Sequence, residues 1–281
     1  MATDTPMSAW LLEILRQHRG TQLALTTTQG NNMSSFDDRV IAWFSCGVAS
    51  AVAASLAIEK YGKDKVVVAY CDTMADEHPD NQRFFDEVQD WLGIKIERLK
   101  SDKFSRVDEV FKSRSFMSGI MGAPCTTELK KMPRFDFQRA DDIHVFGYTS
   151  DENHRITRFK EQNPDVKVDW VLSDQGYSKP LCLMTIGSAG IEIPMMYRLG
   201  YSNNNCLGCV KASSATYWNS IRVHFPDVFK ARSDRSRSVG AKLTRFKGER
   251  IFLDQLPADY LPPDNEVVSC GIDCDIPEET T

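Results

Sequence analysis

Residues 40–50 have the sequence VIAWFSCGVAS, and this stretch decides the fold. Its first five residues are apolar and mostly β-branched or aromatic, which predicts a buried strand over 40–44. Small residues follow, and the Ala-rich segment after them predicts a helix over 50–60. A buried strand joined to a helix by a few small residues is typical of a parallel α/β sheet.

The same alternation of apolar strands and helices continues to about residue 150. We expect further strands over 66–71, 94–99 and 143–147, and helices over 79–92, 105–113 and 126–138. Helices between strands imply crossover connections, so the fold class is α/β with a doubly wound, Rossmann-like parallel sheet. Ligands of such sheets bind beyond the carboxyl ends of the strands, so we expect the site in the loops after 44, 71 and 147.

Pattern and composition divide the chain into three regions. Residues 1–38 predict an N-terminal helix and a polar linker, and residues 39–180 form the predicted α/β domain. Residues 181–281 predict a helical and loop-rich region that carries cysteines and ends in a tail, with one helix over 213–223. We expect several side chains of ambiguous chemistry to belong to the core, namely Cys71, Cys182, His144, Tyr217, Trp218, Ile221, Phe225 and Phe229. Nucleotide stacking is the alternative for the aromatic residues of 217–229.

The overall composition is that of a globular protein, with 42% hydrophobic and 26% charged residues among 281. This balance excludes a disordered, collagen-like or coiled-coil chain. Residues 40–58 carry no charge, but their serines and their change from strand to helix argue against a membrane span. The net charge of −5 provides no general attraction to nucleic acid, so such contact would need a local patch, for which the basic segment 230–250 is the candidate.

Eight cysteines point to a reducing compartment. The first residues lack the basic, apolar and small-residue succession of a signal peptide, so we expect a cytoplasmic protein. In such a compartment, clustered cysteines are more often metal ligands or redox groups than disulfides. The Cys206-x-x-Cys209 spacing lets two thiolates bind one metal ion, although buried reduced thiols are the alternative.

The turn after the first strand predicts an anion site. Gly47 allows close approach of a ligand, Ser45 and Ser50 offer hydroxyl groups, and the N-terminus of the following helix attracts negative charge. A tight turn that uses small residues only for packing is the alternative interpretation.

This loop resembles the pyrophosphate loop of the adenine-nucleotide α-hydrolase superfamily, and later segments resemble its sulfonucleotide (PAPS) reductase branch. The likeness runs in the family's order from about residue 40 to 274. It is carried by Asp72-Thr73 followed by His78-Pro79, by CTTELKKMP at 125–133, by Gly147-Tyr148-Thr149 with Glu152 and Arg155, and by Cys206, Cys209 and Cys270. Two departures stand out: Ala49 occupies the position where ATP-using members carry Asp, and Tyr148 and Thr149 replace an expected Arg.

The resemblance implies an adenine nucleotide as substrate, namely PAPS, adenylylsulfate or ATP. The residues implied to bind it are Ser45, Gly47, Ser50, Asp72, Thr73, Lys130, Gly147 and Arg155. It also implies an iron–sulfur cluster held by Cys125, Cys206 and Cys209, with Cys274 as our first choice of fourth ligand and Cys182 as the second. Zinc is the alternative metal, because zinc and iron both accept thiolate ligands.

The tail Cys270-Gly271-Ile272 is similar to the centre of the branch's C-terminal Glu-Cys-Gly-x-His motif. This similarity implies that Cys270 is the catalytic nucleophile and that a thioredoxin-like partner regenerates it. Cys270 and Cys274 have an i, i+4 spacing, so a pair of metal ligands or a redox pair is the alternative.

The function implied is thiol-dependent reduction of a sulfonucleotide to sulfite. One alternative keeps the nucleotide site but uses ATP for sulfur or amine transfer to a nucleoside or nucleic acid. Another is a non-catalytic, zinc-stabilised module that binds nucleotide or nucleic acid.

Overall fold

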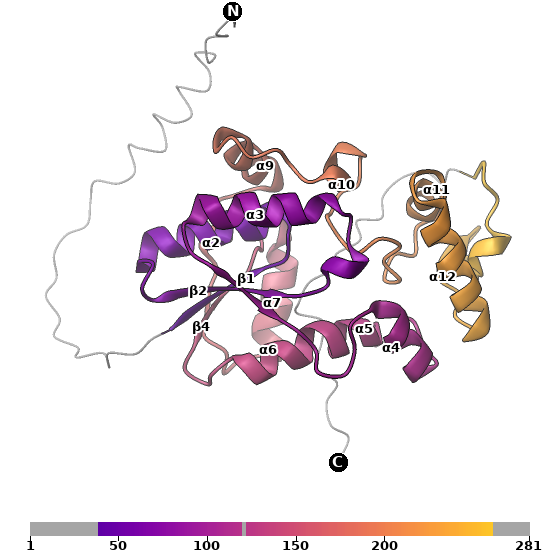
Figure 1. Cartoon of the computed structure of the whole chain (residues 1–281), viewed down its shortest axis with the longest axis horizontal. Helices are drawn as coiled ribbons and strands as arrows, with labels where there is room; N and C mark the ends of the chain where they lie inside the picture. The colour runs from indigo at the N-terminus through magenta and orange to yellow at the C-terminus, as the bar shows by residue number, and fades with distance from the viewer. Residues whose placement is uncertain (1–38, 120–121, 261–281) are drawn as a thin grey trace, which may run out of the picture. The chain divides into compact units, whose positions relative to one another are not determined.

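The computed structural model describes residues 39–119 and 122–260 (Figure 1). Its centre is a five-stranded sheet of order β3-β2-β1-β4-β5, in which every neighbouring pair is parallel. The strands are β1 (Val40–Phe44), β2 (Val66–Cys71), β3 (Ile96–Leu99), β4 (Ile143–Val145) and β5 (Val168–Asp169). The predicted α/β class with a parallel sheet is confirmed, and β5 is an additional strand that the sequence pattern did not predict.

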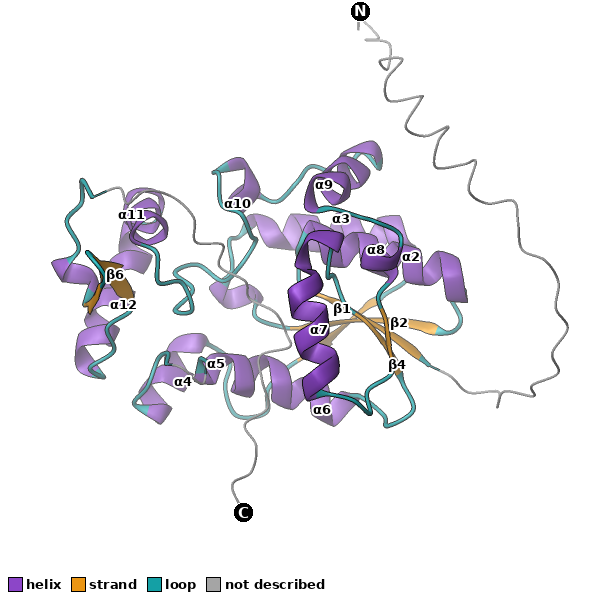
Figure 2. Cartoon of the chain, turned by 180° about the vertical axis from the view of Figure 1, so that it is seen from behind, coloured by secondary structure: helices purple, strands orange, loops and turns teal. Residues whose placement is uncertain are grey.

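Strand β1 shows why both faces of the sheet are covered. Val40, Ala42 and Phe44 pack in one core cluster with helices α2 (Val48–Tyr61) and α3 (Asp80–Leu92). Ile41 and Trp43 pack in a second cluster on the opposite face, which includes residues of α7 (Asn153–Gln162). Figure 2 shows α7 across that face. Alternate residues of β1 therefore enter different cores, which explains its uninterrupted apolar sequence.

The segment predicted as one helix over 126–138 is built from three successive pieces. It begins as α5 (Pro124–Thr126), continues as the π-helical turn η2 (Thr127–Lys131) and ends as α6 (Met132–Phe137). Single π-helical turns inside helices occur frequently at functional sites.

A third core cluster lies outside the sheet. It joins α4 (Val107–Arg114) to α11 (Ala215–His224) and α12 (Pro226–Ser238), and Trp218 is fully buried in it. The hairpin of β6 (Thr244–Phe246) and β7 (Glu249–Ile251) packs on the same cluster. The remaining elements are η1 (Met74–Asp76), η3 (Ser150–Glu152), α8 (Val171–Asp174), α9 (Lys179–Ser188), α10 (Met195–Arg198) and η4 (Leu253–Gln255).

The residues predicted to belong to the core are buried, except for Tyr217, Phe225 and Phe229, which are half-buried and pack against the third cluster. Cys71, Cys182, His144 and Trp218 are each at most 4% exposed, and Trp43 Nε1 donates a 2.9 Å hydrogen bond to His144 Nδ1. Residues 40–58 divide between β1 and α2, and none of the described helices has the length and apolar character needed to cross a membrane. The predicted N-terminal helix and linker (1–38), Cys270 and Cys274 lie outside the described residues.

Candidate functional site

The site lies where the strand order of the sheet reverses. The chain passes from β1 outward to β2 and β3 and then returns to the other side of β1 as β4, so the carboxyl ends of β1 and β4 are neighbours. Ligands of open parallel sheets bind at such a switch point. The loop after β1 contains Ser45 and Gly47, and Ser50 follows in the first turn of α2. The loop after β4 begins at Phe146 and contains Gly147.

The loop after β1 is closed by its own serines. Ser45 N donates to Ser50 Oγ at 3.1 Å, and the Ser50 hydroxyl donates to Gly47 O at 2.9 Å. Gly47 precedes the first turn of α2, and no described side chain caps that turn. The first N–H groups of α2 therefore lack side-chain acceptors, as an anion-binding helix terminus requires.

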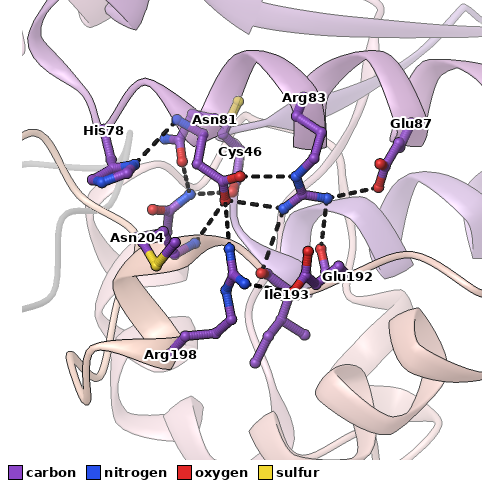
Figure 3. A network of polar contacts seen from close by, with 11 residues as sticks. Cys46, His78, Asn81, Arg83, Glu87, Glu192, Ile193, Arg198 and Asn204 are labelled. Carbon is purple, nitrogen blue, oxygen red and sulfur yellow. Dashed lines mark hydrogen bonds and ion pairs between the residues drawn. The ribbon is translucent and has the colours of Figure 1, made fainter.

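A network of buried polar side chains holds the backbone of this loop in place. Cys46 has a left-handed backbone with φ of 54°, and its carbonyl accepts a 2.6 Å hydrogen bond from Asn204 Nδ2. Asn204 Nδ2 also donates to Asn81 Oδ1 at 2.8 Å (Figure 3). Asn81 in turn donates to Glu77 Oε2 at 2.7 Å. Burial, followed by the charge of Glu77, raises the pKa of the Cys46 thiol well above its ordinary value, so this thiol remains protonated.

Asp72 and Thr73, both predicted to bind nucleotide, follow β2 but differ in environment. Thr73 is 2% exposed, and its hydroxyl donates to Glu77 Oε1 at 2.6 Å, so it belongs to the supporting network. Asp72 is half-buried and lies 3.7 Å from Arg98 and 3.8 Å from Lys100, measured from carboxylate oxygen to side-chain nitrogen. The Asp72 carboxylate remains at the carboxyl end of β2, whereas the Thr73 hydroxyl is turned inward.

Arg155 is held at the end of β4 by contacts within its own segment. It forms an ion pair with Glu152, and its guanidinium lies 4.4 Å from the centre of the Tyr148 ring. Glu152 also accepts a 3.1 Å hydrogen bond from the backbone nitrogen of Thr149. Tyr148, which replaces an expected Arg, therefore provides an aromatic surface for Arg155.

The predicted cysteine ligands come together from separate parts of the chain. Cys125 from α5, and Cys206 and Cys209 from the loop before α11, line one small cavity together with Thr73 and Lys130. Cys182 lies in the sheet core on α9 and is not among the residues lining this cavity, which disfavours it as the fourth ligand.

Backbone contacts fix the shape of the cysteine loop. Arg232 Nε donates to Gly208 O at 3.2 Å, and Cys209 N donates to the Tyr217 hydroxyl at 2.7 Å. Leu207 N donates to Asp76 O at 2.8 Å, which ties the loop to the segment after β2. Gly208 has φ of +62°, a conformation that favours glycine.

Thiolate donors suit zinc or an iron–sulfur cluster. Within residues 39–119 and 122–260, however, no group of three or more His, Cys, Asp or Glu side chains is placed to hold a metal ion. The three cysteines therefore have the right chemistry for the predicted metal and line one cavity, but their side chains are not arranged around a common metal position.

Lys130 links the cysteine cavity to the sheet. Its backbone oxygen accepts a 3.3 Å contact from Cys71 Sγ. Burial raises the pKa of Cys71 to about 11, while the positive charge of Lys130 acts in the opposite direction on both Cys71 and Cys46. The positive charge of Lys130 thus stabilises negative charge at the carboxyl ends of β1 and β2.

No family model and no curated protein matches the chain.

The basic segment 230–250 divides into two parts. In α12, Arg235 pairs with Asp108, Arg237 with Asp254 and Lys230 with Asp234. The cations at or within the β6–β7 hairpin are exposed and form no ion pair with another described residue: Lys242, Arg245, Lys247 and Arg250. Most of the predicted basic surface on α12 therefore stabilises the protein itself.

Two further residues contribute polar groups near the phosphate loop, and the sequence pattern did not predict them. Lys179 begins α9 and Tyr197 belongs to α10, and their side chains contact each other at 3.2 Å. Both come from the region after residue 178, and no local motif connects them to the loop after β1.

Proposed function

We propose that this chain is a PAPS-reductase-like enzyme that binds an adenine nucleotide at the carboxyl ends of β1, β2 and β4. One observation carries the proposal: three cysteines from distant segments line a cavity with Thr73 and Lys130. Thr73 bonds Glu77, and the Glu77 network reaches the phosphate loop through Asn81 and Asn204. Thiols close to a phosphate loop suit a reaction in which sulfur chemistry occurs on a nucleotide.

The reaction we propose is reduction of a sulfonucleotide to sulfite. The Cys270 thiolate attacks the sulfate sulfur, the bond from sulfur to the phosphate oxygen breaks, and the nucleotide leaves with that electron pair. A dithiol partner of the thioredoxin kind then attacks the sulfur of Cys270. This second step releases sulfite, restores the cysteine and oxidises the dithiol to a disulfide.

Cys125, Cys206, Cys209 and Cys274 are the proposed ligands of a cluster or zinc ion. Such a cation would lower cysteine pKa values nearby and offset the negative charge of the substrate. Analysis of iron, zinc and acid-labile sulfide in anaerobically purified protein distinguishes the two metals, and absence of both removes this part of the proposal.

The decisive experiment is sulfite release from PAPS or adenylylsulfate in the presence of a dithiol reductant. We expect release by the wild type and its loss in Cys270→Ser. Cys182→Ala is the matched control, because its thiol lies in the core on α9. Release that persists in Cys270→Ser would remove the nucleophile from the proposal.

ATP-dependent transfer to a nucleic acid is the second candidate, and the exposed cations of the β6–β7 hairpin favour it. ATP-dependent formation of pyrophosphate without sulfite release would support this candidate. Salt-sensitive nucleic-acid binding with no nucleotide turnover would support a non-catalytic module instead.

A further inference from the structure

Tyr197 lies directly above the glycine of the phosphate loop. A Cβ placed on Gly47 would lie 3.5 Å from the Tyr197 hydroxyl, 3.6 Å from Ser45 Oγ and 3.8 Å from Ser50 Oγ. Three hydroxyl groups therefore surround the point where Gly47 leaves space. Lys179 Nζ lies 3.2 Å from the same Tyr197 hydroxyl.

The segment that carries Lys179 is attached to the loop after β4. Ser150 N donates to Tyr177 O at 2.9 Å, and Lys179 N donates to Asp151 Oδ2 at 3.1 Å. These bonds bring Lys179 alongside the loop in which Thr149 stands where an Arg is expected. A cation from a later segment thus lies beside this loop, whose own cation, Arg155, forms an ion pair with Glu152.

The segment that carries Tyr197 is fixed to α3. Asp80 Oδ2 accepts a 2.8 Å hydrogen bond from Met195 N and lies 3.8 Å from the Arg198 guanidinium. Arg83 donates to Glu192 O at 3.0 Å (Figure 3). These contacts fix the segment that carries Tyr197, and so they place its hydroxyl close to Gly47.

Lys179 has no ion-pair partner among the described residues, and the neighbouring Asp151 carboxylate accepts a hydrogen bond from its backbone nitrogen instead. The residue is half-buried, and its ammonium contacts the hydroxyl and the ring of Tyr197. A cation that contacts only a neutral side chain can take an anion as its partner.

We propose that Lys179 and Tyr197 complete the phosphate site, with the Lys179 ammonium binding the terminal phosphate or sulfate group of the nucleotide. Tyr197 is a positioning residue that orients the ammonium and offers its hydroxyl to the same anion. This inference rests on the proposed nucleotide binding.

The test is calorimetric titration of the full chain with pyrophosphate, ATP, PAPS and adenosine. We expect Lys179→Gln to weaken pyrophosphate and nucleotide binding by about 10- to 100-fold, the loss typical of one charge-assisted hydrogen bond, and to leave adenosine binding unchanged. Lys179→Arg retains most of the affinity for these ligands. Tyr197→Phe weakens binding of pyrophosphate and nucleotide by a smaller factor than Lys179→Gln does. Lys95→Gln is the matched control, because it removes the same charge at the amino end of β3.

Two outcomes separate the inference from the proposed function. If the wild type binds pyrophosphate and nucleotide but Lys179→Gln binds them equally well, the role of Lys179 is overturned and the nucleotide site stands. If the wild type binds neither, the proposed function fails and the inference fails with it. Lys179→Arg and Tyr197→Phe keep the test informative if Lys179→Gln is unstable by thermal melting.

Discussion

Gly147 packs against the backbone of Ser50. A Cβ on residue 147 would lie 2.7 Å from Ser50 N and 2.8 Å from Ser50 Cα, closer than real Cβ atoms approach backbone. The loop after β4 therefore rests on the first turn of α2 with no space for a side chain. This contact joins the two loops at the switch point of the sheet into one unit.

Gly147→Ala is expected to destabilise the protein and weaken nucleotide binding. Relief of the clash must move the β4 loop away from Ser50, at a cost of about 1–3 kcal/mol. Urea unfolding measures the loss in stability, and titration with ATP or PAPS measures the loss in affinity. Gly187→Ala is the control, because its Cβ meets nothing within 4 Å and a helical Gly→Ala change is stabilising by up to about 1 kcal/mol. Equal effects of the two changes would contradict the packing argument.

Asn204→Ala is expected to lower the free energy of unfolding by about 1–3 kcal/mol, because it leaves Cys46 O and Asn81 Oδ1 buried without this donor. Asn204→Asp should cost more, since it places carboxylate oxygens against two acceptors. Urea unfolding measures both. Gln162→Ala, at an exposed amide side chain at the end of α7, should change stability by less than about 0.5 kcal/mol.

The Asn204 network also has a binding consequence. Loss of the bond to Cys46 O frees the carbonyl of a residue held at positive φ, so pyrophosphate affinity should fall in Asn204→Ala. A double-mutant cycle with Asn81→Ala should give a coupling energy above about 0.5 kcal/mol. Additive effects would show that the two amides act independently.

Alkylation rates should distinguish core thiols from the rest. Burial raises the pKa of Cys71 to about 11 and that of Cys182 to about 12, so their thiolate fraction at pH 7.5 is on the order of one in a thousand or less. We expect iodoacetamide to modify both residues slowly in native protein and rapidly in urea, as measured by peptide mass spectrometry. Rapid modification of Cys182 without denaturant would contradict its burial in the core.

The fold was predictable where the pattern is local. Strand β1 is apolar on both faces and is followed by an Ala-rich helix, so periodicity and composition agree. Strand β5 has only two residues, which is too short for any periodicity. The π-helical turn at 127–131 was not predictable either, because its sequence fits an ordinary helix.

The site residues also divide into those that a local sequence motif predicts and those that it does not. Ser45, Gly47 and Ser50 are contiguous with β1, so a local motif identifies them. Lys179 follows an N-cap Ser and precedes a Pro, a sequence that predicts only the start of a helix. Arg235 belongs to a run of cations, and only the tertiary structure shows that Asp108 pairs with it. Residues that reach the site through packing of α9 and α10 carry no sequence signal of that role, and neither does the pairing of Arg235.

His144 should make stability depend on pH between about 4 and 6.5. Burial, followed by the charge of Arg134, lowers the His144 pKa from 6.5 to about 4, so the unfolded chain binds a proton in this range that the folded protein does not. The contribution of His144 to the free energy of unfolding is therefore fully present above pH 6.5, and it falls by about 3 kcal/mol as the pH decreases to 4. His144→Asn keeps an acceptor for Trp43 Nε1 but does not titrate, so urea unfolding at pH 7.5 and 5 should show a smaller difference than in the wild type. An identical difference in both proteins would exclude His144 as the source.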